Sequence, residues 1–227
     1  MAMAYLAQAS TMLGSLTDRI RVSLSRAGLR YGEYSGNYDR LTRLYRRRDP
    51  WNLANSGDGA RFAETNRRIA RASPDCPSLL ELGAGEGIQT GFLARVAARV
   101  TAIELSQEAI DRARQRVPHA HFLNGRAEDL SALVQGQRFA VATACEMPYY
   151  VRDPGAVLAA LQQVADLIVV TNHARLDHKV SFLFDGTGWR RTADIRHGRT
   201  RWHCYHWQSP HRHRAPDIAA LHQGNPS

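Results

Sequence analysis

The sequence has few cysteines and no long apolar run. Its three cysteines, Cys76, Cys145 and Cys204, lie far apart and form no Cys-x-x-Cys pair. Such spacing is typical of reduced thiols in the cytoplasm and argues against a disulfide framework or a zinc finger. No stretch approaches the roughly 18 apolar residues of a membrane span, and the first residues carry no basic leader before an apolar block. We therefore expect a cytoplasmic protein without a transmembrane span.

Lysine is nearly absent: Lys179 is the only lysine, and every other Lys or Arg position is arginine. Residues 1–48 carry a net charge of +6, residues 49–189 of −2 and residues 190–227 of +5. Two basic ends therefore flank a near-neutral body that is large enough for one α/β domain. Such ends fit RNA, anionic lipid or an acidic substrate, and they also fit a chain that simply uses arginine throughout.

Hydrophobic spacing divides the chain into three parts. Residues 5–29 place leucines and an isoleucine on one helical stripe, which predicts a helix that packs on the body or on a second copy. The protein would accordingly be a monomer or a homodimer. We assign residues 1–60 to this helix and a helical lid segment, residues 61–208 to a cofactor-binding domain, and residues 209–227 to a flexible tail.

Within the body, apolar runs of strand length alternate with helical stretches, as in a parallel sheet covered by helices. The last two runs, 189–196 and 200–207, are joined by a short turn with a glycine and predict an antiparallel hairpin. The expected fold class is α/β and Rossmann-like, with a seven-stranded, mostly parallel sheet. The other expected strands are 78–83, 100–104, 120–124, 138–144 and 166–171, and the expected helices are 61–72, 88–98, 107–116, 128–134 and 154–164, with Ser106 and Asp153 as N-caps.

A glycine-rich loop directly follows the first predicted strand. Residues 81–87 read Glu-Leu-Gly-Ala-Gly-Glu-Gly, and Glu104 ends the next apolar run. Glycines suit a sharp turn whose backbone approaches a ligand, and a carboxylate at the second strand tip can accept hydrogen bonds from a ribose diol. The spacing differs from the GxGxxG of dinucleotide enzymes, and Glu81 would repel a pyrophosphate but suit a sulfonium. A nicotinamide or flavin enzyme, or a turn without a ligand, is the alternative.

The Glu-x-Gly-x-Gly-x-Gly loop, with an acidic end to the second strand, resembles motifs of class I methyltransferases, which use S-adenosylmethionine and release S-adenosylhomocysteine. This resemblance implies that Leu105 packs on the adenine and that Ala127 and Glu128 meet its amino group, although Glu128 would alternatively cap the next helix. Arg67 would bind the methionine carboxylate or remain a solvated helix arginine. The expected cofactor-binding residues are Trp51, Arg67, Glu81, Gly83, Ala84, Gly85, Glu104, Leu105, Ala127, Glu128 and Cys145.

Three segments resemble, more narrowly, the nodulation N-methyltransferase (NodS-like) family. They are Asp49-Pro-Trp51 with Phe62-Ala-Glu-Thr-Asn-Arg67, the glycine loop, and Glu146-Met-Pro-Tyr-Tyr-Val151 after the fourth strand. Known members methylate the amine of a deacetylated amino sugar at the end of a chitin-like oligosaccharide, so the resemblance implies a small-molecule acceptor. Within the first segment, the Asp-Pro turn would aim the indole inward, as part of a lid over the cofactor.

The end of the fourth strand also resembles the Asn-Pro-Pro-Tyr signature of enzymes that methylate amino groups of nucleic acids, with Glu146 in place of the amide. A carboxylate suits an aliphatic ammonium better than an aryl amine, because it can pair with the cation and take its proton. We therefore expect Glu146 to orient an amine. His173, Tyr149 or Tyr150 would help to remove the amine's proton.

Other functions stay open on the sequence. Methylation of a hydroxyl would need a base that ionises it in the same pocket. Methylation of an RNA adenine amino group would use the basic ends, and binding would fall steeply with salt. A protein that binds the cofactor without catalysis would keep the same loop. No metal site is predicted, since His203 and His206 would point to opposite faces of one strand and zinc needs three or four convergent ligands.

Overall fold

The computed structural model describes residues 34–186 and 188–210, so the predicted helix of residues 5–29 and most of the predicted tail lie outside the described residues. These residues form a seven-stranded sheet in the order β3-β2-β1-β4-β5-β7-β6. Strands β1 to β5 are parallel, whereas β7 runs antiparallel to both β5 and β6. The predicted α/β, Rossmann-like fold with its closing hairpin is confirmed. The strands are β1 (Leu79–Leu82), β2 (Val100–Glu104), β3 (His121–Asn124), β4 (Phe139–Cys145), β5 (Ala165–His173), β6 (Trp189–His197) and β7 (Thr200–Gln208).

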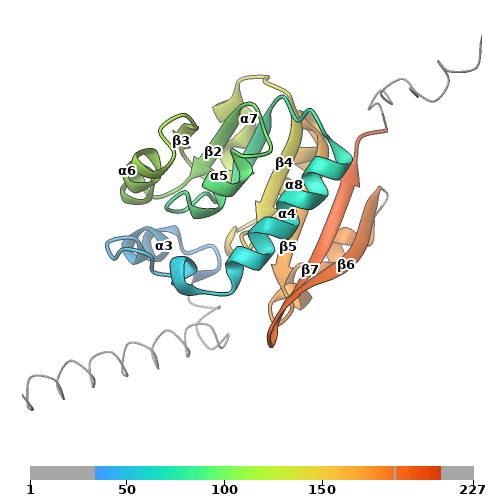
Figure 1. The fold of residues 1–227 in the computed structure, drawn as a ribbon. Coiled ribbons are helices and arrows are strands. Elements are labelled where there is room, and N and C mark those ends of the chain that lie inside the picture. The colour runs from blue at the N-terminus through green and yellow to red at the C-terminus, as the bar shows by residue number, and fades with distance from the viewer. Residues whose placement is uncertain (1–33, 187, 211–227) are drawn as a thin grey trace, which may run out of the picture.

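Helices surround this sheet, as the ribbon in Figure 1 shows. Side chains of α4, α5 and α6 pack on one face, and those of α7 and α8 pack on the other. Ser106 and Asp153 cap α6 and α8 as predicted, because each side chain accepts a backbone N–H of the first turn. No helix among the described residues has the length and apolar character to cross a membrane. The helices are α3 (Tyr38–Leu44), α4 (Asp58–Ala72), α5 (Ile88–Leu93), α6 (Gln107–Arg116), α7 (Leu130–Val134) and α8 (Pro154–Val164), with short 3-10 turns η1 (Leu53–Asn55), η2 (Ala127–Asp129), η3 (Pro148–Tyr150), η4 (Asp177–Lys179) and η5 (Ser181–Phe184).

The central strands are buried on both faces, which explains why they read as continuous apolar runs. In β1, Leu79 packs in the cluster with α4 and α5, whereas Leu80 packs in the cluster with α7 and α8. Val141 and Ala142 of β4 divide between the same two clusters. The side chains alternate because successive residues of a strand point to opposite faces. The hydrophobic core therefore consists of two layers separated by the sheet.

The helix predicted at residues 88–98 is shorter than expected. It ends at Leu93, and the next residues form tight turns. The Ala98 N–H donates to the Cys76 carbonyl at 2.9 Å, so the backbone bonds of this stretch connect to the chain before β1 rather than extend the helix. Apolar spacing alone could not show where these hydrogen bonds go.

Residues 34–57, which we name the covering segment, fold back onto the loops at the carboxyl ends of the strands. The Gly36 N–H donates to the Tyr150 carbonyl at 2.8 Å, after β4. The Asp49 N–H donates to the Glu86 carboxylate at 2.9 Å, after β1. The covering segment is thus hydrogen-bonded to two strand tips that are separate in the sequence.

We expect Leu80→Ala to lower the free energy of unfolding by about 2–5 kcal/mol, because it leaves a cavity in a fully buried cluster. Phe182→Ala is the matched control, since the residue Phe182 is 63% exposed. Phe182→Ala should lower the free energy of unfolding by no more than about 0.5 kcal/mol. Urea unfolding followed by circular dichroism measures both, and equal losses would contradict this account of the core.

Candidate functional site

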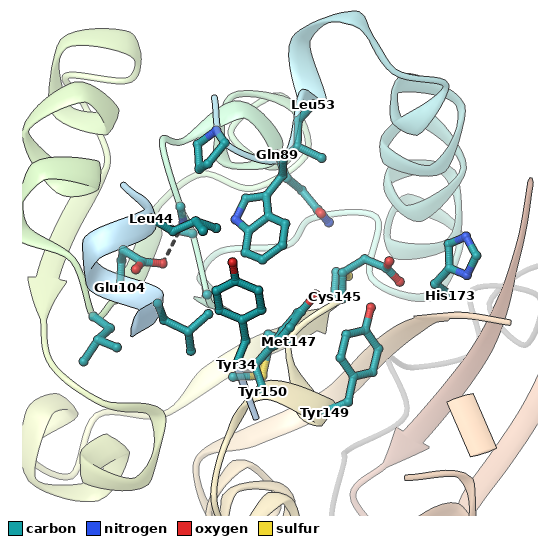
Figure 2. A pocket seen from close by; sticks show the side chains of 18 of the residues that line it. Tyr34, Leu44, Leu53, Gln89, Glu104, Cys145, Met147, Tyr149, Tyr150 and His173 are labelled. Carbon is teal, nitrogen blue, oxygen red and sulfur yellow. Dashed lines mark hydrogen bonds between the residues drawn. The ribbon is translucent and has the colours of Figure 1, made fainter. Parts of the chain in front are cut away.

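A cavity of about 700 Å³ lies at the carboxyl ends of β1, β2, β4 and β5. Ligands of parallel sheets bind at this edge, where loops from several strands meet. The covering segment and the start of α4 form the opposite wall. Figure 2 shows Tyr34, Leu44 and Leu53 of the covering segment around the cavity that Glu104 and Met147 also line. The cavity therefore lies between the sheet and the segment that precedes it.

The glycine loop after β1 permits close backbone approaches. Gly83 and Gly85 have φ angles of 74° and 53°, in the left-handed region that favours glycine. A Cβ on Gly83 would lie 3.0 Å from the Met147 Cβ, and one on Gly85 would lie 2.9 Å from the Tyr45 hydroxyl oxygen. Glycines at these positions let the tip of β1 meet both the tip of β4 and the covering segment.

Glu104 ends β2 with a fixed carboxylate. Its Oε2 accepts the Gly85 N–H at 2.8 Å, and its Oε1 accepts the Ser106 N–H at 3.0 Å. Burial raises the pKa of this carboxyl group, while the backbone donors act in the opposite direction. A carboxylate has about four acceptor sites, so these two bonds leave capacity for donors of a ligand in the cavity.

Glu128 connects the loop after β3 to the covering segment. Its carboxylate accepts hydrogen bonds from the Tyr38 hydroxyl and, at 3.0 Å, from the Arg152 N–H. Burial raises the pKa of Tyr38 to about 12, and the bond to Glu128 adds to this shift. The N-cap of α7 is Asp129, without a side-chain cap bond. Glu128 thus lines the cavity rather than capping this helix.

Tyr45 and Trp51 close the cavity above the glycine loop. The Tyr45 hydroxyl accepts the Trp51 Nε1–H at 3.0 Å. The Trp51 ring also lies against two further aromatic rings, with centroids 5.5 Å from Tyr150 and 6.2 Å from Tyr34. The indole lines the cavity, so the structure places it inward as the Asp-Pro turn predicts.

Glu146 follows β4 at the other end of the cavity. Its φ of 60° is left-handed, a conformation that is costly for a residue with a Cβ and that occurs preferentially at functional sites. Burial raises the pKa of its carboxyl group to about 7, while the nearby Arg61 guanidinium lowers it. Its Oε1 is buried without a hydrogen-bond partner among the described residues. This oxygen therefore keeps an unused capacity to accept a hydrogen bond.

Two neighbours of Glu146 are arranged as proton donors. The Tyr149 hydroxyl bonds to Glu146, and burial raises its pKa well above the usual value, so it stays protonated near neutral pH. The His173 Nδ1 accepts the Arg175 N–H at 3.2 Å. The proton of the neutral ring must then reside on Nε2. Of these groups, Glu146 is the one arranged to accept a proton.

Arg61 in the first turn of α4 lines the cavity and was not among the predicted site residues. Its side chain is only 2% exposed, and Nη1 donates to Gln89 Oε1 at 2.8 Å. Burial lowers the pKa of the guanidinium, but Glu146 and other anionic groups more than offset this, so the pKa is raised and the charge is kept. Arg61 thus places a buried positive charge in the cavity wall.

The predicted Arg67 does not reach the cavity. Its side chain is 64% exposed and forms an ion pair with Glu64. Helical spacing distinguishes the two arginines, because Arg61, Thr65 and Ile69 share the buried face of α4. That spacing was the available signal, and it favours Arg61 over Arg67.

Glu81 also lies apart from the cavity lining. It is 4% exposed, and its carboxylate accepts the Thr90 hydroxyl of α5. Burial raises its pKa to about 7. The other predicted residues come together around the cavity: Trp51, Gly83, Ala84, Gly85, Glu104, Leu105, Ala127, Glu128, Cys145, Glu146, Tyr149, Tyr150 and His173. Lining residues that were not predicted include Tyr34, Tyr38, Arg61, Gln89 and Met147.

The family model of nodulation protein S (NodS) matches residues 33–176, which contain the covering segment and strands β1 to β5. The chain belongs to the NodS family. Nodulation protein S of Sinorhizobium fredii (strain NBRC 101917 / NGR234) is 29% identical over 138 residues, which cover 60% of this chain and 63% of that relative. The match thus spans less than two thirds of the relative's length.

Two further comparisons concern methyltransferases. The mitochondrial ubiquinone biosynthesis O-methyltransferase of Schizosaccharomyces pombe is 34% identical over 89 residues, or 37% of this chain and 32% of that protein. The crystal structure of N-methyltransferase NodS from Bradyrhizobium japonicum WM9, in complex with S-adenosyl-L-homocysteine, has a TM-score of 0.63 at 19% identity. The structural match covers 76% of this chain and 98% of the NodS chain, so the two proteins share a fold.

The NodS family match ends before the hairpin of β6 and β7. This hairpin still borders the cavity, through Arg199, Thr200 and Trp202. One wall of the site is therefore built from a part of the chain outside the NodS family match.

We expect Glu146→Gln to change how stability depends on pH. The ordinary carboxyl pKa of 4.5 rises to about 7 in the folded state, so the unfolded chain loses this proton first as the pH rises. Wild type should consequently lose stability relative to Glu146→Gln between pH 5 and pH 8. Urea unfolding at both pH values measures the difference. Asp75→Asn, which removes an exposed carboxylate, is the control, and an equal shift in both variants would contradict the burial of Glu146.

Proposed function

We propose that this protein transfers a methyl group from S-adenosylmethionine to the amine of a small polar acceptor, an amino sugar or a natural-product intermediate. The observation that carries the proposal is the placement of two carboxylates with different surroundings in one cavity. Glu104 is fixed beside the glycine loop, and Glu146 has a free oxygen at the tip of β4. Membership of the NodS family supports this function, since a NodS N-methyltransferase of this fold is known in complex with S-adenosylhomocysteine.

The Glu104 end of the cavity fits an adenosyl group. Glu104 keeps acceptor sites for ribose hydroxyls, Leu105 and Ala127 offer apolar contact, and the Glu128 carboxylate can accept from an exocyclic amine. The buried Arg61 guanidinium would hold the carboxylate of the methionine portion in place of the predicted Arg67. When bound, the cofactor's sulfonium supplies an activated methyl group.

The Glu146 end of the cavity fits an amine. An aliphatic ammonium must lose a proton before its nitrogen can act as a nucleophile. The Glu146 carboxylate can pair with the ammonium and accept that proton, because its raised pKa of about 7 makes it a stronger base than an ordinary carboxylate. Tyr149 donates to the same carboxylate and fixes its orientation. Glu146 would thus take the proton and leave the nitrogen lone pair free for the methyl group that the cofactor would supply, with S-adenosylhomocysteine as the leaving group.

The covering segment would complete the site by excluding water. Tyr45 is buried over Gly85, and Trp51 donates to its hydroxyl. Exclusion of water strengthens electrostatic contacts and holds the reactants in one arrangement. Alignment of nucleophile and methyl carbon can contribute about 7 kcal/mol or more to the lowering of the barrier. We therefore assign the covering segment the role of a lid.

We expect Glu104→Ala to abolish micromolar binding of S-adenosylhomocysteine, because the variant loses the ribose acceptor and the anchor of the Gly85 N–H. Isothermal titration calorimetry on the pure protein measures this. Glu104→Gln keeps the size of the side chain, so it tests the contribution of the negative charge without leaving the empty space that alanine would create. Glu108→Ala is the control, since Glu108 is exposed four residues further on. Unchanged affinity in both Glu104 variants would exclude this cofactor site.

We expect Glu146→Gln to lower methyl transfer to amino sugars by about 10²-fold or more, which is the usual effect of a lost general base. The wild-type kcat/KM should rise with pH and level off above about 7, where Glu146 is ionised. This inflection should be absent in the variant. Transfer of labelled methyl groups between pH 5.5 and 9 measures both properties. A variant that keeps the wild-type pH profile would show that another group accepts the proton.

A further inference from the structure

A second, smaller cavity of about 270 Å³ adjoins the first. The two cavities share His173, Arg175, Arg199 and Thr200 in their linings. Because these four residues contribute to both, the smaller cavity is an outer chamber at the mouth of the larger one. A molecule whose amine reaches Glu146 would extend into this chamber if it were longer than the inner site.

Four of the eight residues that line the outer chamber are arginines. Arg175 follows β5, Arg196 lies near the end of β6, and Arg199 and Arg201 flank the start of β7. All four side chains are exposed, and no acidic residue lines the chamber. Among the described residues, only one of the four has an acidic partner within salt-bridge distance, and this is Arg201, 3.8 Å from Asp194. The chamber is therefore strongly positive.

Hydrogen bonds fix the backbone of the loop after β5 and of β7, which carry Arg175 and Arg201. The Ala174 N–H donates to the Arg201 carbonyl at 2.9 Å, which links the end of β5 to β7. The buried Asp177 attaches the loop after β5 to β7. Its carboxylate accepts the Tyr205 hydroxyl at 2.7 Å and contacts His203 Nδ1 at 2.6 Å. Arg175 and Arg201 thus come from ordered elements that converge on one chamber.

We propose that the outer chamber binds a phosphate-type anion carried by the methyl acceptor, so that the acceptor is an amine with a phosphate ester on the same small molecule. This inference rests on the proposed function for the amine end. Guanidinium groups bind phosphate oxygens through paired N–H donors, and several of them around one chamber match a group of two negative charges. The inner Glu146 and the outer arginines would then select a molecule with opposite charges at its two ends.

An acceptor with a second free amine fits this arrangement less well. A second free amine in the outer chamber would face the four guanidinium groups, and like charges repel. Arginines also bind the phosphates of nucleic acids, but this chamber opens into the cavity that contains Glu146. We therefore assign the chamber to a small phosphorylated acceptor. The test below also examines RNA binding.

The test compares glucosamine with glucosamine 6-phosphate and glucosamine 1-phosphate as acceptors in the full chain. We expect kcat/KM at least tenfold higher for one of the phosphorylated sugars. In Arg175→Gln/Arg199→Gln this preference should fall to about twofold or less. The matched control is Arg71→Gln/Arg99→Gln, which removes two exposed arginines near the amino ends of β1 and β2. Its preference should equal that of wild type.

Two binding measurements separate this inference from the function on which it rests. Inorganic pyrophosphate, titrated by calorimetry, should bind wild type and the control at least fivefold more tightly than Arg175→Gln/Arg199→Gln. This holds even if S-adenosylhomocysteine fails to bind, an outcome that would end the methyltransferase proposal but not the anion site. Equal pyrophosphate affinity in all three proteins, or no preference for either phosphorylated sugar in an active enzyme, would overturn the inference. Loss of affinity for a short single-stranded RNA in the chamber variant, without a sugar-phosphate preference, would reassign the surface to nucleic acid.

Discussion

The buried charge of Arg61 joins the parts of the site that are separate in the sequence. The residue belongs to the first turn of α4, just after the covering segment, and its guanidinium reaches Gln89 of α5 and Thr171 of β5. A buried cation is costly unless anions and acceptors surround it. Asp58 supplies one such anion at 3.3 Å, and Glu146 supplies another nearby. Helices α4 and α5 and the tips of β4 and β5 must therefore keep their relative positions for this charge to remain satisfied.

Glu146 differs from Arg61, because part of its carboxylate has no hydrogen-bond partner in the described part of the chain. Burial raises its pKa, Arg61 opposes the shift, and the backbone at this residue adopts a left-handed conformation that other residue types would adopt more cheaply. Burial of the charge and the left-handed backbone each cost stability in the isolated protein, whereas the Arg61 interaction offsets part of this cost. Together they leave a carboxylate oxygen without a partner at the cavity wall. Such a group is expected where the chain gives up stability to hold a proton acceptor in place.

Charge is thus ordered along the cavity. The fixed carboxylate of Glu104 lies at the glycine loop, the buried Arg61 and the nearby Glu146 lie at the other end of the larger cavity, and exposed arginines surround the mouth. The NodS family match contains the first two regions and ends before the hairpin that supplies most of the third. The segments proposed to hold the cofactor and accept the amine proton therefore lie within the NodS family match, whereas most of the proposed anion site lies in the hairpin beyond it.

The sequence by itself determined the order of strands and helices, the glycine loop with Glu104, and the Glu146 strand tip, because periodicity and short motifs are local properties. It also placed most lining residues, since the carboxyl ends of parallel strands must share one edge. The helical spacing of α4 held a signal for Arg61 over Arg67, and the fold shows that Arg61 enters the site. Tertiary structure alone decided that Glu81 faces α5. It also decided that His173 accepts the Arg175 N–H at Nδ1. These outcomes depend on which groups fold against one another across long separations, and a buried charge or a ring nitrogen takes its role from partners that no local pattern identifies.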